Sequence, residues 1–151
     1  MRENTRVLNA REGKAIFALL EHQWGYSKKL PYALLQSNSD RLYLITGDFG
    51  RIPPRTLNLD AAGLYFGELR NEELRLSIEG SQLIGPPATK NIAEIDPMTM
   101  RKWLKGEDIP WSGPGEGFLL IKCGRDFCGT GKLKEGKILN FVPKARRILS
   151  D

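Results

Sequence analysis

Basic residues and glycines are concentrated between Gly117 and Arg147, and this combination of residue types can bind phosphate groups. Residues 1–117 carry 15 Lys/Arg and 15 Asp/Glu, so their formal charges cancel. Residues 118–151 carry 8 Lys/Arg and 3 Asp/Glu, a difference of +5 that equals the net charge of the whole chain. Such an asymmetry indicates a polyanionic partner, and nucleic acid is the commonest one.

Two arginines near the C-terminus are the best candidates for phosphate contacts. Arg146 and Arg147 can each bind two phosphate oxygens, because a guanidinium presents a planar fork of N–H groups. Lysines supply a more diffuse attraction. Bases of single-stranded or bulged RNA would stack on Phe141 or Trp111, although Trp111 is expected mainly in the core because tryptophans bury most of their area.

Gly129, Gly131 and Lys132, in the run GTGK, look like part of a phosphate loop, but the spacing excludes a P-loop. That motif needs a glycine five residues before the second glycine and Ser or Thr after the lysine, whereas this chain has Asp126 and Leu133 there. The glycines are instead expected to allow a bulge or a close backbone approach within a strand. This explanation leaves the role of Lys132 open.

The sequence contains no recognisable catalytic motif. It lacks G-x-S-x-G, H-E-x-x-H and a G-x-G-x-x-G that follows a strand, so we expect no enzyme activity and no cofactor. A carboxylate pair assembled from distant positions remains an alternative. His22 is the single histidine, and it is expected at the surface or at the rim of the core.

The two cysteines, Cys123 and Cys128, are not expected to bind a metal. With one histidine in the chain, they cannot complete a four-ligand zinc site without carboxylates or a second chain. A disulfide across a turn is an alternative, but a cytosolic setting favours two small, partly buried thiols.

The bulk composition is typical of a soluble globular protein of one or two small domains, with 151 residues, 40% hydrophobic and 27% charged. No apolar run approaches the roughly 20 residues needed to cross a bilayer. The polar start, MRENTRVLNAREG, lacks the apolar segment of a secretory signal. We therefore expect a cytoplasmic protein without a membrane association.

In the first half, the pattern predicts one helix and several strands. Asn9 and Glu12 have the spacing of a capping box, and Gly25 suits a left-handed terminal residue, which together place a helix over residues 10–24. Strands are expected over residues 41–46, 62–69 and 74–79, with Pro53-Pro54 excluding a regular helix between the first two. The strongest break, Gly85-Pro86-Pro87, predicts a boundary between domains 1–87 and 88–151.

In the second half, the pattern predicts a helix that starts at Pro97, with Asp96 as its cap, and ends at Gly106. Met100, Trp103 and Leu104 form its apolar face. The nearby cations Arg101, Lys102 and Lys105 either complement the helix dipole or extend the basic surface. A loop is expected over residues 109–115, followed by a three-strand meander over 118–122, 127–133 and 137–142.

Several runs of the second half resemble the PUA domain, an RNA-binding pseudo-barrel. They are D-P-x-x-x-x-x-W-L-x-G ending at Gly106, G-F-L-L-I-K-x-G ending at Gly124, G-x-G-K ending at Lys132, and N-F-V-P-K-x-R-R ending at Arg147. The last run is most similar to the version in archaeal relatives of Sun-type RNA (cytosine-5) methyltransferases. The order of the upstream strands resembles the small pre-PUA domain of ribosome-biogenesis factors.

This resemblance implies an α+β fold, in which a small α/β pre-PUA domain is followed by a PUA pseudo-barrel. It implies RNA binding along the glycine loop after the helix, at Lys105 and Gly106, and along the last strand, at Lys144, Arg146 and Arg147. Together with the charged and glycine positions above, the candidate RNA-binding residues are Lys102, Lys105, Gly106, Lys122, Arg125, Gly129, Gly131, Lys132, Lys144, Arg146 and Arg147.

We therefore expect a monomeric, non-enzymatic protein that binds structured rRNA or tRNA in ribosome biogenesis or RNA modification. The chain lacks the cofactor loop and the catalytic cysteine motifs of the methyltransferases, so a methyltransferase or a ribosome-assembly factor is an expected partner. The competing hypothesis is a protein-interaction adaptor whose basic surface binds an acidic partner.

Overall fold

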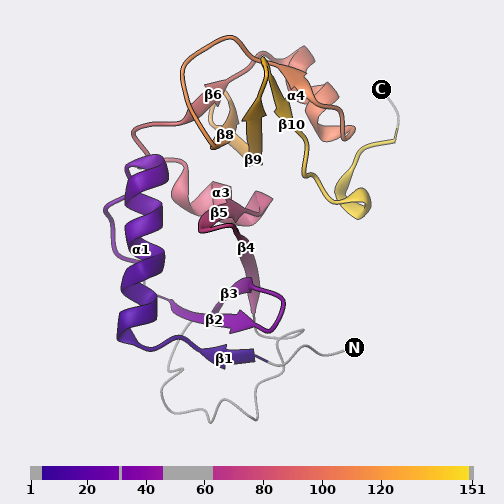
Figure 1. Ribbon diagram of the computed structural model, residues 1–151. Coiled ribbons are helices and arrows are strands. Elements are labelled where there is room, and N and C mark those ends of the chain that lie inside the picture. The colour runs from indigo at the N-terminus through magenta and orange to yellow at the C-terminus, as the bar shows by residue number, and fades with distance from the viewer. Residues whose placement is uncertain (1–4, 31, 46–62, 150–151) are drawn as a thin grey trace.

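The computed structural model describes residues 5–30, 32–45 and 63–149, which form an α+β fold built on two five-stranded sheets. The sheets lie in different halves of the molecule, and a short helix lies between them (Figure 1). The predicted α+β class is confirmed. No helix in these ranges is long and apolar enough to span a membrane.

The first sheet is antiparallel, and its strands follow one another in chain order from β1 to β5. Their bounds are Thr5–Val7, Ala33–Ser37, Arg41–Ile45, Leu64–Arg70 and Glu73–Leu76. The first two predicted strands correspond to β3 and β4, while Pro53-Pro54 lies outside the described residues. The sequence does not predict β1 and β2, because both are short and show no clear alternation of polarity.

Helix α1 (Ala10–Trp24) begins and ends as predicted. The backbone N–H of Glu12 donates to Oδ1 of Asn9 at 2.8 Å, and the backbone N–H of Asn9 donates to Oε1 of Glu12 at 3.0 Å. Gly25 ends the helix with φ of 68°, a left-handed conformation that glycine adopts without strain. Local capping therefore fixes both ends of α1.

The predicted third strand is only partly right, because β5 stops at Leu76 and helix α3 (Ile78–Ile84) begins directly after it. Ser77 caps this helix by accepting from the backbone N–H of Gly80 at 2.9 Å. Gly80 lies against β4, where an added Cβ would approach the carbonyl oxygen of Phe66 to 2.2 Å. The alternation Leu74, Leu76, Ile78 continues across the strand end by coincidence, since Ile78 is already helical.

The second sheet has the order β6-β8-β9-β10-β7, and only the β6–β8 pair is parallel. Its strands are Ile92–Glu94 (β6), Ile109–Pro110 (β7), Phe118–Cys123 (β8), Asp126–Lys134 (β9) and Lys137–Leu139 (β10). The predicted meander is confirmed as β8-β9-β10, although β10 ends three residues earlier than expected. The predicted loop after residue 108 instead starts with β7, which is too short to show a pattern and is formed by pairing with β10.

Helix α4 (Pro97–Leu104) packs across the second sheet through its predicted apolar face. Trp103 is completely buried, and its indole Nε1 donates to the carbonyl oxygen of Cys128 at 2.8 Å. This bond ties α4 to β9. It thereby fixes the position of the residues that follow the helix.

The cap of α4 leads to a pH-dependent prediction. Hydrogen bonds from the side chain and the backbone of Thr99 hold the pKa of Asp96 below its usual value. The stability that the carboxylate contributes is therefore fully present above about pH 4 and is lost as the pH falls through the lowered pKa of the folded state.

Asp96→Asn keeps a good cap without a titrating group. Thermal unfolding of both proteins should show wild type losing its advantage over the variant between neutral pH and about pH 3; a constant difference would contradict this assignment.

The largest core cluster is shared by the two halves of the chain. It combines Leu20 and Trp24 of α1 and Phe66 of β4 with Phe118 and Leu120 of β8. The indole Nε1 of Trp24 donates to the carbonyl oxygen of Phe118 at 3.0 Å. The two halves on either side of residues 85–87 thus share a core, and the predicted division into domains 1–87 and 88–151 stays a prediction.

Candidate nucleic-acid interface

A close contact between Gly106 and Arg147 is the centre of the basic surface. Gly106 has φ of 96°, and an added Cβ would lie 2.4 Å from Nε of Arg147. The arginine side chain therefore lies directly on the glycine backbone, which only glycine permits. Nε of Arg147 donates to the carbonyl oxygen of Val142 at 2.9 Å. That bond orients the guanidinium and leaves its two terminal nitrogens for other acceptors.

The C-terminal segment is held beside the end of α4 by the backbone. The N–H of Ile148 donates to the carbonyl oxygen of Leu104 at 3.0 Å, next to the short 3₁₀ helix η3 (Lys144–Arg146). Four cations thus come from two neighbouring elements, with Lys102 and Lys144 exposed and Lys105 and Arg147 partly buried. We call Lys102, Lys105, Gly106, Lys144 and Arg147 the α4–η3 patch.

Asn140 ties the segment that leads into η3 to the end of α4 and the loop after it. Its Nδ2 donates to the carbonyl oxygens of Trp103 and Glu107, both at 2.8 Å, and its Oδ1 accepts from the backbone N–H of Val142 at 2.8 Å. The backbone N–H of Asn140 donates to Asp108 at 2.8 Å. Sequence reasoning assigned this residue to a motif but gave it no role. Its amide can satisfy donors and acceptors at once, which a charged or apolar side chain cannot.

Charged side chains of both signs lie in and around the patch. Its four cations contribute +4, while the exposed Glu107 and Asp108, three and four residues after the end of α4, contribute −2. The C-terminal end of α4 also carries the partial negative charge of the helix dipole, which stabilises Lys102 and Lys105 in place. The patch and these two acids together therefore carry a formal net charge of +2.

Two predicted RNA-binding residues are instead paired with acids of the first half of the chain. Nη1 of Arg146 lies 2.8 Å from Oε2 of Glu79 in α3. Nζ of Lys132 binds Oε1 of Glu73 in β5 and lies 5.0 Å from the centre of the Phe118 ring. These contacts partly neutralise both cations, so the predicted set does not form one continuous free surface.

Lys122 and Arg125 belong to a different part of the second sheet, at the β8–β9 turn. Nζ of Lys122 lies 3.5 Å from Glu94 and 5.8 Å from the centre of the Phe127 ring. Arg125 is exposed in the turn itself. No contact links these two residues to the α4–η3 patch within the described part of the chain, so their RNA-binding role stays a prediction for a separate surface.

Gly129 and Gly131 are buried in β9 and do not reach the surface. An added Cβ at Gly131 would lie 2.5 Å from Cη2 of Trp103, and the backbone N–H of Gly129 donates to Oγ of Ser81 at 2.7 Å. Gly131 makes room for α4, whereas at Gly129 an added Cβ would lie 3.6 Å from Cγ1 of Ile78, an ordinary contact, and the φ of 88° is what favours glycine there. This placement confirms the close-approach explanation for Gly131, and the burial of both glycines argues against direct RNA contact there, which stays a prediction.

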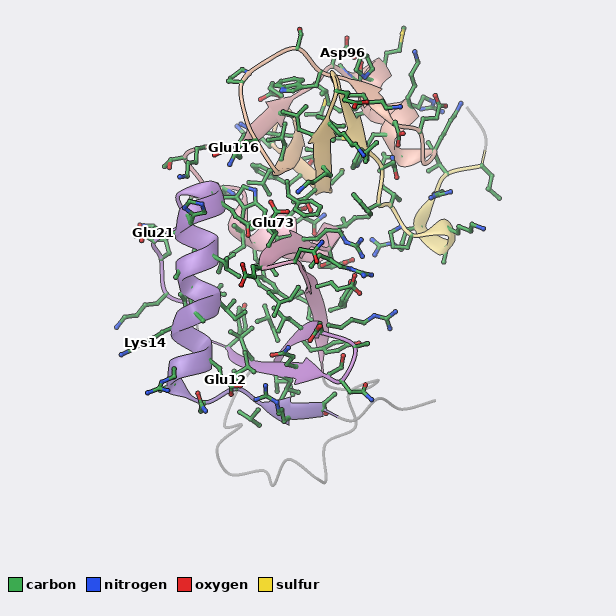
Figure 2. The ribbon with its side chains drawn as sticks, viewed as in Figure 1. Glu12, Lys14, Glu21, Glu73, Asp96 and Glu116 are labelled. Carbon is green, nitrogen blue, oxygen red and sulfur yellow. The ribbon has the colours of Figure 1, made fainter. Side chains whose placement is uncertain are left out.

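The described residues offer no metal site, and one cavity that carries a histidine and carboxylates lies outside the α4–η3 patch. Among the described residues, no group of three or more His, Cys, Asp or Glu could hold a metal ion. A cavity of about 260 Å³ is lined by His22, Glu73 and Glu116, where the two halves meet (Figure 2). One of these carboxylates, Glu73, already binds Lys132.

The two cysteines are free thiols, and both are partly buried, as the sequence predicted. Burial raises the pKa of Cys128 above its usual value, and the nearby Asp126 and Cys123 add to the effect. The thiol is therefore protonated at neutral pH, which makes it a poor nucleophile and a poor metal ligand.

Comparison with known proteins finds one relative that matches most of the chain and one family model that matches its second half. The chain is 25% identical over 138 residues, 91% of its length, to the ribosomal RNA small subunit methyltransferase F of Aeromonas salmonicida (strain A449), and it spans 28% of that protein. Residues 90–148 match the family model of the PUA domain of the methyltransferase RsmF. This range contains α4, all five strands of the second sheet and η3. Residues 90–148 are therefore similar to the PUA domain of RsmF-type methyltransferases, the domain that the sequence motifs indicated.

Proposed function

We propose that this chain binds small-subunit ribosomal RNA through the α4–η3 patch, as the RNA-recognition part of an rRNA methylation system. The observation that carries this proposal is the seating of Arg147 on Gly106. It holds a guanidinium in place before binding, so that little side-chain entropy is lost when a phosphate is bound. The methyltransferase name of the relative supports rRNA over tRNA as the ligand.

We further propose that methyl transfer is performed by a partner methyltransferase unit and not by the residues described here. Neither the sequence motifs nor the cavity at Glu73 supports a cofactor site, and the matched part covers 28% of the relative. In this proposal the first half is the pre-PUA domain, the second closes as a PUA pseudo-barrel, and the chain acts as a cytoplasmic monomer.

A protein adaptor is the second candidate, and one observation favours it. Lys122, Lys132 and Arg146 are each paired with a carboxylate, which weakens their attraction for a polyanion and leaves a surface that a folded partner could also match. The two candidates differ in their dependence on salt, because only a nucleic acid releases many condensed counterions when it is bound.

Binding to labelled fragments of small-subunit rRNA, measured by fluorescence anisotropy across a salt series, tests the proposal. We expect micromolar or tighter binding, with log K falling by about 0.7–0.9 per phosphate contact for each log unit of salt. If each of the four cations of the patch meets one phosphate, the total slope is about 2.8–3.6. Absence of binding at low salt would overturn the proposal and favour the adaptor. Equal binding to tRNA would show that the patch does not distinguish these RNAs.

A further inference from the structure

Among the Phe, Tyr and Trp residues of the described ranges, Phe141 is the most exposed, at 37%. It lies in the segment that runs from β10 to η3 (Figure 1), three residues before Lys144 of the α4–η3 patch. Three residues of chain span at most about 11 Å. Trp111, the other aromatic side chain that the sequence offers for stacking, is partly buried, and its indole Nε1 donates to the carbonyl oxygen of Pro114 at 3.2 Å. Phe141 is therefore the ring that an RNA strand on the patch can reach.

Arg75 of β5 covers part of this ring and is held in place by a buried carboxylate. Its guanidinium carbon lies 4.6 Å from the centre of the Phe141 ring, and its Nη2 donates to Oε2 of Glu68 at 2.9 Å. The side chain of Arg75 is 20% exposed and that of Glu68 is 6% exposed. A guanidinium has five N–H donors, and within the described part of the chain Glu68 is the one acceptor that bonds to Arg75. The other N–H groups can therefore donate to a ligand.

A small cavity lies beside the Phe141 ring, between the first sheet and the C-terminal segment. It has a volume of about 70 Å³, and its lining includes Tyr65, Arg75, Thr130, Phe141 and Arg146. An apolar cavity of about 150 Å³ takes up a whole benzene ring. The cavity beside Phe141 therefore has room for the edge of a nucleobase and not for a complete one.

We propose that one unstacked base of the RNA bound at the α4–η3 patch packs against Phe141 and places its edge in this cavity, where Arg75 donates to a carbonyl oxygen of the base. This inference rests on the proposed RNA-binding function and adds a base-binding site to it. Unstacked RNA bases pack on aromatic rings and on arginine planes, and they are recognised through hydrogen bonds to their edges. A base is uncharged, so Glu68 and Glu79, which are paired with Arg75 and Arg146, do not repel it as they would repel a phosphate.

Phe141→Leu tests the proposal by binding to labelled rRNA fragments across a salt series. The variant keeps an apolar side chain beside Phe118 and removes the ring, so the affinity should fall at least about 5-fold. Because no charge is removed, the salt slope should stay as in wild type. Phe141→Tyr keeps a ring and should bind like wild type. The matched control is Met98→Ala, which removes an exposed apolar side chain from the first turn of α4, at the end of that helix away from the patch, and should leave the affinity unchanged.

Abasic sites placed one at a time along the rRNA fragment test the same contact from the RNA side. At one position, loss of the base should weaken binding to wild type about 5- to 100-fold. The same abasic site should weaken binding to Phe141→Leu much less, because the two changes remove one shared contact. At that position adenine, which has no carbonyl oxygen, should bind more weakly than uracil.

The outcomes separate this inference from the proposed function. If wild type binds rRNA but no abasic site weakens it, or if the losses from the protein and the RNA changes simply add, the base site is refuted while the α4–η3 patch stands. A lower salt slope for Phe141→Leu would also refute it, since a phosphate contact would then have been lost. If wild type does not bind RNA, both proposals fail together. Should Phe141→Leu not fold, photo-crosslinking of 4-thiouridine RNA to wild type should label Phe141 or Tyr65, and labels confined to the α4–η3 patch would overturn the inference.

Discussion

Reversing the charges of Lys144 and Arg147 together should weaken rRNA binding at least about 100-fold at near-physiological salt. Each charge-assisted contact contributes about 1.5–3 kcal/mol, and two glutamates in the same places add repulsion. The salt slope should fall by about 1.4–1.8 as two phosphate contacts are lost. Anisotropy titrations of Lys144→Glu/Arg147→Glu against the same rRNA fragments measure both quantities.

The control for this experiment is Lys28→Glu/Lys29→Glu, which changes the net charge by the same amount away from the patch. It should reduce affinity only slightly, because exposed charges beyond a Debye length of about 8–10 Å are largely screened. Equal losses in the two double variants would show that RNA responds to overall charge and that the patch is not a site.

Gly106→Ala tests whether RNA affinity depends on the position of the Arg147 guanidinium as well as on its charge. The new Cβ would meet Nε of Arg147 at 2.4 Å, so the guanidinium must move while the net charge stays the same. We expect a weaker affinity with a smaller change in salt slope than charge reversal produces. Unchanged affinity in a folded Gly106→Ala protein would remove the pre-positioned guanidinium from the proposal.

Trp24→Ala should destabilise both halves of the chain together, by about 3–5 kcal/mol. Trp24 is completely buried in the shared core, and its indole N–H bonds to Phe118 of the second sheet. For a chain of this size, such a loss corresponds to a melting temperature lower by about 10 °C or more. Thermal unfolding followed by circular dichroism measures it.

The same variant reports on the two halves separately. Its remaining tryptophans, Trp103 and Trp111, both lie in the second half, so their fluorescence follows that half, while far-ultraviolet circular dichroism follows α1 most strongly. We expect the two transitions to coincide, because the common core makes unfolding cooperative. Separate transitions would establish residues 1–87 and 88–151 as independent domains. Trp24→Phe, which keeps an aromatic ring but loses the N–H and part of the indole volume, should cost less than Trp24→Ala, about 1–3 kcal/mol.

The predictions from sequence succeeded where short-range signals determine the structure. Asn9 with Glu12, and Asp96 with Pro97, satisfy helix-end groups within one turn, so α1 and α4 could be placed from local spacing. The glycine at position 106 and the turn at residues 134–137 are equally local. These local signals predicted the order of elements that resembles the PUA domain. The excess of positive charge beyond residue 117 could likewise be counted from the sequence alone.

The tertiary structure alone decided which of those charges remain available. Glu73 lies 59 residues from Lys132, and Glu79 lies 67 residues from Arg146. A pairing at such a distance along the chain depends on how the two sheets pack, which no local pattern encodes. For the same reason the sequence missed the stacking of Arg75 on Phe141. The sequence missed α3 because the alternation of Leu74, Leu76 and Ile78 continues past the end of β5. Residue types and spacing indicated the kind of partner that we propose, and packing between the halves decided which cations are paired with acids and which are not.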